Sequence, residues 1–283
     1  MPADAGLLPP GAWDCHTHLF RGSDGGVTEA LIALDALHAR LGIAHGVVVQ
    51  TSLQAKDDEG FAQAIESRPR LRGVALIDDS TSDAMLERMH AAGIRGCRFQ
   101  FVSFLKSRAD PDVVKRNADR VARLGWHMLV HLQGEDLIAQ APLLRNLPLP
   151  VVIDHLAHTR CADGLDQPSF RLMRDLLETE NHIWVKLSSG DRWSVDGPPD
   201  YRDAIPFGRT LVETRPDRLI WATDWPHTQY KNPFAPGEPP PDPAHLVDLL
   251  FAYAPRAEDR DRILTVNPMA LYGDGDRRKD PIR

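Results

Sequence analysis

Short apolar runs rich in β-branched residues recur along the whole chain. Eight of them can be distinguished, at a mean spacing of about 29 residues, close to the length of one strand-plus-helix unit. Most are continuously apolar rather than alternating, as expected for parallel strands covered on both faces. The predicted strands are Trp13–Phe20, Gly46–Gln50, Gly73–Ile77, Gly96–Phe101, His127–Leu132, Val151–His155, Ile183–Ser188 and Leu219–Asp224.

The segments between these runs have the periodicity of amphipathic helices. Leucines recur on one helical stripe between residues 28 and 41, and Gly42 can end that helix in a left-handed conformation. Asp110 and Pro111 provide an N-cap and a first-turn proline for another helix. The predicted helices are Thr28–Leu41, Ser82–Ala92, Asp110–Leu124, Pro168–Glu180 and Tyr201–Thr214.

Eight such units in a chain of this length predict a (β/α)8 barrel. An open doubly wound sheet is the alternative, but no glycine-rich phosphate-binding turn follows the first run. We therefore predict an α/β protein with one TIM-type barrel domain over residues 1–272 and a polar tail over 273–283. Residues 232–243, seven of which are proline or glycine, predict either a rigid loop at the mouth of the barrel or a plain surface connection.

Composition excludes several classes of partner. The chain is 42% hydrophobic and 26% charged, which is ordinary for a globular protein, and its net charge of -7 without a basic block argues against nucleic acid and anionic membranes. No apolar run approaches 18 residues, and no basic segment leads into one at the N-terminus. The three cysteines lack metal-type spacing, so we expect free thiols in a cytoplasmic protein.

Ionisable residues fall at the carboxyl ends of several predicted strands, where a barrel of this kind has its active site. His16 and His18 alternate on the first strand, so both point to the same face. Two converging imidazoles can hold a metal or polarise a substrate oxygen. Burying polar residues at so many strand ends would be costly without a function. The later strands contribute Arg98, His131, His155, Lys186 and Asp224.

An ordered set of motifs carries these residues over nearly the whole chain. It comprises residues 14–20 (DCHTHLF), 95–101 (RGCRFQF), 151–155 (VVIDH), 197–199 (GPP) and 220–227 (IWATDWPH), with Asn267-Pro268 and Leu271-Tyr272 near the end. Each motif alone is a weak signal, and the ordered set is a strong one. The set resembles the amidohydrolase superfamily (amidohydrolase 2 type), and within it the lactonase group that includes 2-pyrone-4,6-dicarboxylate lactonase.

The resemblance implies hydrolysis of a carboxylated lactone, of the pyrone, muconolactone or sugar-acid type. Asp224 would be the general base, because a carboxylate at a strand end can accept a proton from the attacking water. His16, His18 and His155 would bind or polarise the ester carbonyl. The structural alternatives are a turn-capping aspartate at position 224 and a hydrogen-bonded core histidine at position 155.

Basic residues are the candidates for binding the substrate's carboxylates. Arg98 lies in an apolar strand and needs an anionic partner, which is either a substrate carboxylate or an internal Asp or Glu. The resemblance implies a further arginine in the stretch of Lys106 and Arg108, in an undetermined register. Arg192, after the seventh strand, is either another substrate-facing arginine or a solvated loop residue.

The chain departs from the family's pattern at His131, where the pyrone lactonase has an aromatic residue and works without a metal. In one interpretation His131 completes a site for one divalent ion, most simply Zn²⁺, that activates water or the carbonyl. In the other it contacts the substrate and no metal is obligatory. His158 and Arg160 also differ from the family's loop, so the dicarboxylated pyrone itself is not implied as the substrate. In the interpretation with a metal, the ligands of the ion would be His16, His18, His131 and Asp224.

Two other functions are compatible with the sequence. A metal-dependent decarboxylase of the same superfamily would act on a small carboxylated substrate, with its ion at His16, His18, His155 and Asp224. A barrel that binds a small anion without turnover is the non-enzymatic alternative. The number of ionisable residues at strand ends argues against simple binding.

Overall fold

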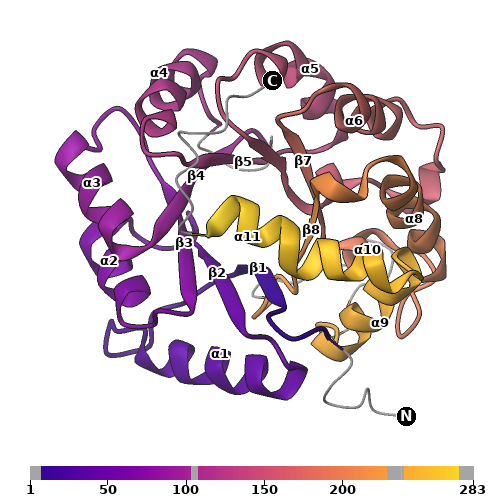
Figure 1. The fold of residues 1–283 in the computed structure, drawn as a ribbon, viewed down its shortest axis with the longest axis horizontal. Helices are drawn as coiled ribbons and strands as arrows, with labels where there is room; N and C mark the ends of the chain where they lie inside the picture. Colours follow the sequence, from indigo (N-terminus) through magenta and orange to yellow (C-terminus); the bar gives the residue numbers. More distant parts are fainter. Residues whose placement is uncertain (1–7, 103–107, 228–236, 238, 274–283) are drawn as a thin grey trace.

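The computed structural model describes residues 8–102, 108–227, 237 and 239–273. Eight parallel strands are hydrogen-bonded in the order of the sequence, and helices surround them (Figure 1). This arrangement confirms the predicted (β/α)8 TIM-type barrel. The strands are β1 (Trp13–Thr17), β2 (His45–Val49), β3 (Leu71–Leu76), β4 (Ile94–Gln100), β5 (His127–His131), β6 (Val151–Ile153), β7 (Ile183–Leu187) and β8 (Leu219–Trp221).

The barrel is completed where β1 meets the end of β8. Thr17 and Trp225 form a bridge there, and the Asp224 N–H donates to the His16 carbonyl at 3.0 Å. The His18 N–H donates to the Trp225 carbonyl at 2.9 Å. The backbone alone therefore brings the two histidines of the first strand to the aspartate after the last one.

The five helices predicted from the sequence are present, with ends shifted by a few residues. In α1 (Thr28–Leu41), Gly42 has the left-handed φ of 75° expected of a helix terminator. Ser82 and Asp110 cap α3 (Asp83–Ala92) and α4 (Pro111–Ala122) by accepting hydrogen bonds from backbone N–H groups. The other two are α6 (Pro168–Thr179) and α8 (Ile205–Thr214), and α8 follows a 3-10 turn over Arg202–Ala204.

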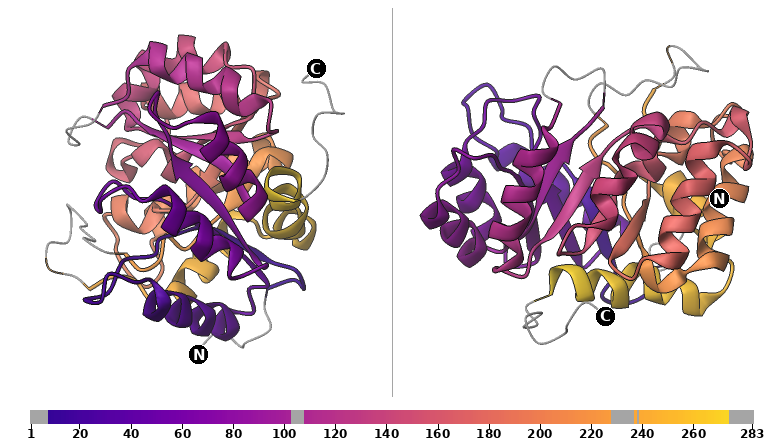
Figure 2. Two further views of the ribbon diagram at one scale, coloured as in Figure 1. Left: turned by 90° about the vertical axis from the view of Figure 1, so that its left-hand side faces the viewer. Right: turned by 90° about the horizontal axis from the view of Figure 1, so that it is seen from above.

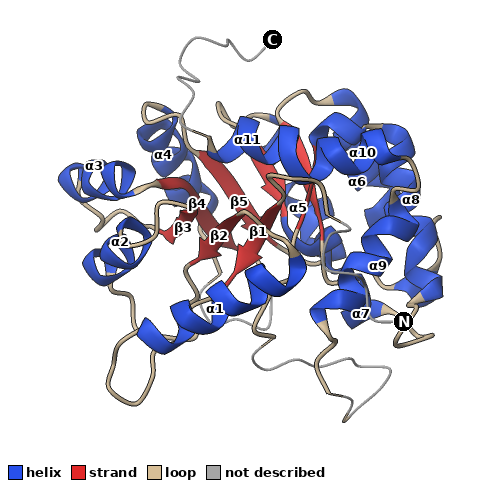
Figure 3. Cartoon of the chain, turned by 60° about the horizontal axis from the view of Figure 1, so that its bottom comes forward, coloured by secondary structure: helices blue, strands red, loops and turns tan. Residues whose placement is uncertain are grey.

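The remaining helices complete the outer ring and the end of the chain, as Figure 3 shows. Of the predicted irregular stretch, residues 232–236 and 238 lie outside the described residues, and its last residue, Pro243, already belongs to a helix. The predicted tail beyond Gly273 also lies outside them. The helices that complete the ring and the end of the chain are α2 (Asp58–Glu66), α5 (Gly134–Arg145), α7 (Gly190–Trp193), α9 (Pro243–Tyr253), α10 (Ala257–Asp261) and α11 (Asn267–Tyr272).

Two apolar layers hold the barrel together. The larger one lies between the strands and the surrounding helices, and the smaller one fills the inside of the barrel with residues such as Val47, Leu129 and Ile220. Cys15 and Cys97 are buried free thiols, and Cys161 is a partly exposed one. No helix in the described part of the chain is long and apolar enough to cross a membrane.

The amino ends of the strands are closed by stacked rings and by α11, which crosses that end of the barrel (Figures 1 and 2). Trp13 stacks on His45 and Tyr272 at centroid distances of 4.6 and 5.9 Å. His127 meets the same tyrosine ring edge-on at 4.9 Å. We call this the amino end of the barrel, and the opposite end, where His131 and Asp224 lie, the carboxyl end.

Candidate active site at the carboxyl end of the barrel

A β-bulge in β1 places its two histidines at the site. The register with β2 shifts between Asp14 and Thr17, which adds one residue to β1. Cys15 can therefore pack inside the barrel while His16 and His18, of the opposite parity, still point to the carboxyl end. The Nε2 atoms of the two imidazoles lie 3.2 Å apart, as the sequence predicted for side chains on one face.

Asp224 lies beyond β8 with a left-handed φ of 61° and faces three imidazoles. Its Oδ1 is 3.7 Å from His16 Nε2 and 3.8 Å from the Nε2 atoms of His18 and His155. Arg192, in α7, donates a hydrogen bond to Oδ2 at 2.7 Å. Burial opposes ionisation, but His155 and Arg192 together hold the pKa of Asp224 well below its ordinary value. The carboxylate is therefore ionised at neutral pH.

The predicted strand Val151–His155 ends early, and this is a correction to the sequence-based expectation. β6 stops at Ile153, and His155 lies in a tight turn with a φ of 50°. That turn, and not the strand, aims the His155 ring into the site. Its Nδ1 is 2.8 Å from the Ser188 hydroxyl and 3.1 Å from that of Ser189. Burial lowers the pKa of His155 to about 4, so the ring is neutral at neutral pH.

Asp154 is the centre of a buried network that the sequence analysis missed. Its Oδ1 is 3.1 Å from Lys186 Nζ and 3.2 Å from His16 Nδ1. Its Oδ2 is 3.2 Å from Arg98 Nη2 and 3.3 Å from His155 Nε2. Burial would raise the pKa of Asp154, but its neighbours, His155 foremost, lower it well below its ordinary value. Asp154 thus holds two cations and two imidazoles together in the barrel.

Strand parity would have identified Asp154 and Lys186. Val152 on β6 and Trp184 on β7 belong to the apolar cluster inside the barrel. Two residues further along each strand direction, the same face carries Asp154 and Lys186. On β8 the same parity runs from Ile220 through Ala222 to Asp224, four residues beyond Ile220. The sequence analysis noted the ionisable lysine but assigned it no role.

His131 and His158 form a separate pair of imidazoles. Their Nε2 atoms are 3.1 Å apart, and the His158 ring lies 5.4 Å from Trp193. Burial lowers the pKa of His158 to about 3 and that of His131 well below its ordinary value. His131 is 5.8 Å from His155 between ring centroids, so the pair borders the cluster around Asp224. It presents neutral rings rather than charge.

The predicted basic residues have different surroundings. Arg98 forms the internal ion pair with Asp154 described above, and its Nε atom is buried with no hydrogen-bond partner among the residues that the structure describes. Arg192 faces the site through Asp224. Arg108 is half-exposed and donates to Asp136 of α5 at 3.0 Å. Lys106 lies outside the described residues.

Within the described part of the chain, two sets of side chains have the spacing of a metal site. One is His16, His18 and Asp224, and the other is His16, Asp154 and His155. His131 belongs to neither. His18 suits a metal, because its Nδ1 donates to the Val49 carbonyl at 2.7 Å and leaves a lone pair on Nε2. His16 does not, because Lys186 Nζ lies 2.8 Å from its Nδ1. The spacing of these side chains fits a divalent ion. The contact between Lys186 and His16 Nδ1 opposes one, because a ring that accepts at Nδ1 carries its hydrogen on Nε2.

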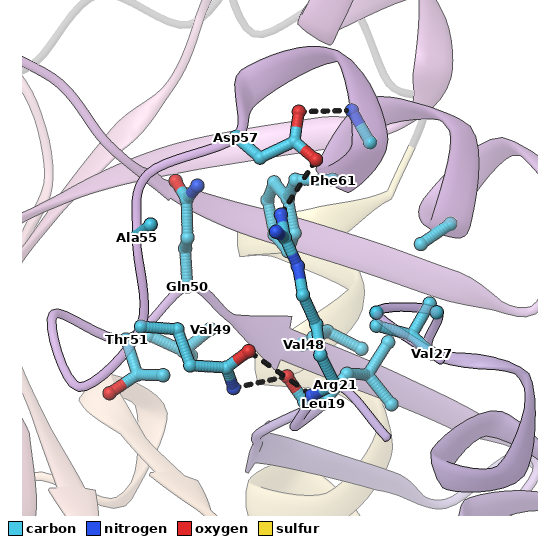
Figure 4. Close-up of a pocket in the computed structure, with 15 residues that line it drawn as sticks. Leu19, Arg21, Val27, Val48, Val49, Gln50, Thr51, Ala55, Asp57 and Phe61 are labelled. Atoms are coloured by element: carbon cyan, nitrogen blue, oxygen red, sulfur yellow. Dashed lines mark hydrogen bonds and ion pairs between the residues drawn. The ribbon is translucent and has the colours of Figure 1, made fainter. Parts of the chain in front are cut away.

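A cavity of about 200 Å³ lies beside the cluster, between the connections that follow β1 and β2 (Figure 4). Its walls are mostly apolar, with Val48 and Phe61 among them, and Arg21 crosses toward Asp57 to form an ion pair. Among the described residues, those that line the cavity include neither Asp224 nor any of the histidines around it. The cavity is therefore distinct from the ionisable cluster.

A family model described as amidohydrolase matches residues 13–273, which is nearly the whole chain. The chain belongs to this amidohydrolase family. A 2-pyrone-4,6-dicarboxylate hydrolase of Comamonas testosteroni is 36% identical to this amidohydrolase, and the similarity covers 94% of this chain and 91% of the relative. A 4-sulfomuconolactone hydrolase of Hydrogenophaga intermedia is 33% identical over 94% and 90%.

A solved structure from Agrobacterium tumefaciens has the same fold as this amidohydrolase. Its TM-score is 0.79, and the similarity covers 97% of this chain and 99% of the other. The sequence identity is 24%, so this likeness concerns the fold alone.

Proposed function

We propose that this amidohydrolase opens the ring of a carboxylated lactone by hydrolysing its ester bond, with Asp224 as the general base. The two relatives described above, a pyrone-dicarboxylate hydrolase and a sulfomuconolactone hydrolase, support the reaction class. The observation that carries the proposal is one ionised carboxylate, Asp224, facing three imidazoles at 3.7–3.8 Å. These separations exceed hydrogen-bond distance, so Oδ1 of Asp224 is not hydrogen-bonded to the imidazoles, and one oxygen placed beside them could contact the carboxylate and an imidazole together.

The proposed reaction begins with a water molecule held against Asp224. The carboxylate takes a proton as the water oxygen attacks the ester carbonyl carbon. The bond between that carbon and the ring oxygen then breaks, the ring oxygen receives the proton that Asp224 took up, and the new carboxylic acid loses its own proton to solvent. The product is the open-chain acid, with one carboxylate and one hydroxyl or enol group in place of the ester. No electrons are gained or lost.

His16, His18 and His155 bind or polarise the ester carbonyl, and a neutral ring with its hydrogen on the nitrogen that faces the site donates to the oxygen on which negative charge develops. Preorganised N–H donors in a buried site act strongly on such a charge, because little water competes with them. The low pKa of His155, about 4, keeps this ring neutral in the resting site, so it acts as a hydrogen-bond partner rather than as a fixed cation. The Ser188 and Ser189 hydroxyls at its Nδ1 fix the orientation of the ring.

Arg192 couples substrate binding to the base. In the resting site it donates to Asp224, which weakens that carboxylate as a base. A substrate carboxylate offers Arg192 a second anionic partner, and sharing the guanidinium leaves Asp224 freer to accept a proton. A lactone without a carboxylate lacks this effect. We therefore propose an anionic substrate.

The other predicted substrate contacts surround this centre. We propose that Arg98 provides positive charge from below the site and that His131, with His158, contacts the far side of the lactone. Arg108 and Lys106 come from the stretch after β4, and we assign them to a second carboxylate. A Zn²⁺ ion, if bound by His16, His18 and Asp224, would supply a Lewis acid for the carbonyl. None of the steps above depends on it, and the hydrogen bond on His16 opposes it.

The experiment is a panel of purified lactones, with and without carboxylates, assayed for loss of lactone and for carbon dioxide. Ring-opened acid without carbon dioxide is the expected product, and released carbon dioxide would establish the decarboxylase instead. Arg192→Met should lower kcat/KM for a carboxylated lactone by about 10²-fold and leave an uncharged analogue nearly unaffected. Equal losses on both would contradict the role of Arg192. Arg202→Met, at an exposed ion pair with Asp200, is the matched control.

A further inference from the structure

Lys186 is a fully buried cation whose role the proposed mechanism leaves open. Its Nζ lies 2.8 Å from Nδ1 of His16 and 3.1 Å from Oδ1 of Asp154. An ammonium group has three donors and no lone pair, so the ring nitrogen beside it must accept. Burial lowers the pKa of Lys186, and the Asp154 carboxylate at 3.1 Å opposes that shift and favours the charged form of the lysine. From this side, therefore, Nδ1 of His16 carries no hydrogen.

The competing arrangement would have His16 donate from Nδ1 to Asp154. Those atoms are 3.2 Å apart, farther than the lysine contact. Oδ1 of Asp154 also accepts no aligned hydrogen bond from the residues that the structure describes. Lys186 Nζ is thus the closer partner of His16 Nδ1, at 2.8 Å against 3.2 Å for Asp154.

His18, on the Nε2 side of His16, also favours a hydrogen on His16 Nε2. Its Nδ1 is 2.7 Å from the Val49 carbonyl, which can only accept, so the hydrogen of the neutral ring is on Nδ1. Its Nε2 then carries a lone pair and faces Nε2 of His16 at 3.2 Å. Two lone pairs at this distance repel each other, whereas one proton between them makes a hydrogen bond. A hydrogen on His16 Nε2 satisfies both neighbours.

We infer that Lys186 is a positioning residue that holds His16 in its Nε2–H tautomer. This tautomer makes His16 a hydrogen-bond donor toward the reacting carbonyl. It also removes the lone pair on Nε2 that a metal ion would need. In the resting site the donors run in one direction, from Lys186 to His16, to His18 and to the Val49 carbonyl, and a bound substrate carbonyl would replace His18 as the acceptor from His16 Nε2. The role toward the carbonyl rests on the proposed lactone hydrolysis, whereas the tautomer does not.

The direct test is nitrogen NMR of the resting protein, labelled with ¹⁵N in its histidines and prepared without metal. His16 is assigned by the signals lost in His16→Gln. We expect the His16 signals to show protonated Nε2 and bare Nδ1, and those of His18 to show the reverse. A protonated Nδ1 on His16 would overturn the inference. That result would leave the proposal of lactone hydrolysis standing, because the NMR measurement tests only the tautomer and uses no substrate.

A variant separates positioning from simple structural support. Lys186→Met combined with Asp154→Asn removes one charge of each sign and leaves an amide oxygen that can accept from His16 Nδ1. We expect His16 to change to the Nδ1–H tautomer and Zn²⁺, the probe ion, to bind at least tenfold more tightly, measured by competition with a chelator. Adding His18→Gln should abolish that gain. An unchanged tautomer in the folded double variant would contradict the inference.

Two controls keep the outcome clear. Lys115→Met changes an exposed lysine that pairs with Asp112 on the surface, and it should leave both the tautomer and Zn²⁺ affinity as in the wild type. If the double variant does not fold, the spectrum of the wild-type protein still decides the tautomer.

Discussion

His127 and His131 lie at opposite ends of β5, four residues apart and on the same side of the strand. At the amino end, His127 Nδ1 is 2.9 Å from the Arg95 carbonyl, and its ring packs against Tyr272. At the carboxyl end, His131 meets another imidazole, that of His158. A histidine on the same face of β5 therefore packs against Tyr272 at the amino end of the barrel and lies beside the Asp224 cluster at the carboxyl end.

The two ends differ in how tightly their polar groups are packed. At the amino end, glycine is required at position 96 because a Cβ there would lie 2.3 Å from the His127 ring. At the carboxyl end, Oδ1 of Asp224 lies 3.7–3.8 Å from three imidazoles, which is too far for a hydrogen bond to any of them. Close packing at one end provides the rigidity with which the other end can hold its buried ion pairs in place.

The largest expected effect is on catalysis at the carboxyl end. Asp224→Asn removes the proposed base while keeping its shape, and we expect kcat/KM to fall by about 10³-fold or more. Asp217→Asn, just before β8 at the amino end, is the matched control, and its activity should stay within about twofold of the wild type. A comparable loss in both variants would mean that the two ends are not functionally distinct.

Trp13→Ala tests the amino end. The ring is buried and stacks on His45 and Tyr272, so its removal should lower the free energy of unfolding by about 3–5 kcal/mol. The kcat of the folded fraction should change little, because Trp13 lies at the opposite end of the barrel from Asp224. Urea denaturation and active-site titration measure the two quantities. A loss of kcat without a loss of stability would contradict the comparison.

Arg98→Met should raise KM by about 10²-fold, or about 2.7 kcal/mol of binding, through the loss of positive charge at the carboxyl end. Arg95→Met is its control on the same strand, because Arg95 donates to the backbone carbonyls of His90 and Ile94 near the amino end. A normal KM in Arg98→Met would show that this residue serves only its ion pair with Asp154.

The smallest effect is on acid stability. Burial lowers the pKa of His158 to about 3, whereas an unfolded histidine binds a proton near pH ~6.5. The unfolded state therefore gains protons as the pH falls through that range while the folded state does not, and stability is lost below pH ~6.5. One such histidine contributes at most about 1.4 kcal/mol per pH unit. His158→Gln should reduce the slope of unfolding free energy between pH 7 and 5, and an unchanged slope would contradict the assignment.

Hydrophobic periodicity and helix-end signals predicted the barrel and the five helices because those features are local in sequence. The strand ends were less well predicted, since β6 is only three residues long and the φ of His155, not strand geometry, aims its ring. The bulge in β1 has no local signal that we can identify. It is nevertheless the reason that residues of both parities serve one side of the strand.

The candidate site was predicted where the residue type itself suggested chemistry. His16, His18 and Asp224 do converge. Asp154 was missed because it stands beside a more conspicuous histidine, although the parity of β6 pointed to it. The role of Lys186 depends on a contact with His16, 170 residues away in sequence, which only the closed barrel reveals.

The most direct test of the central claim uses water labelled with ¹⁸O and a carboxylated lactone that the wild-type protein consumes. Mass spectrometry of the product after a single turnover should show the open-chain acid with one ¹⁸O in its new carboxylate, no carbon dioxide, and no product in the same time with Asp224→Asn. Release of carbon dioxide, or an acid without ¹⁸O, would contradict hydrolysis by an Asp224-activated water at the carboxyl end of the barrel.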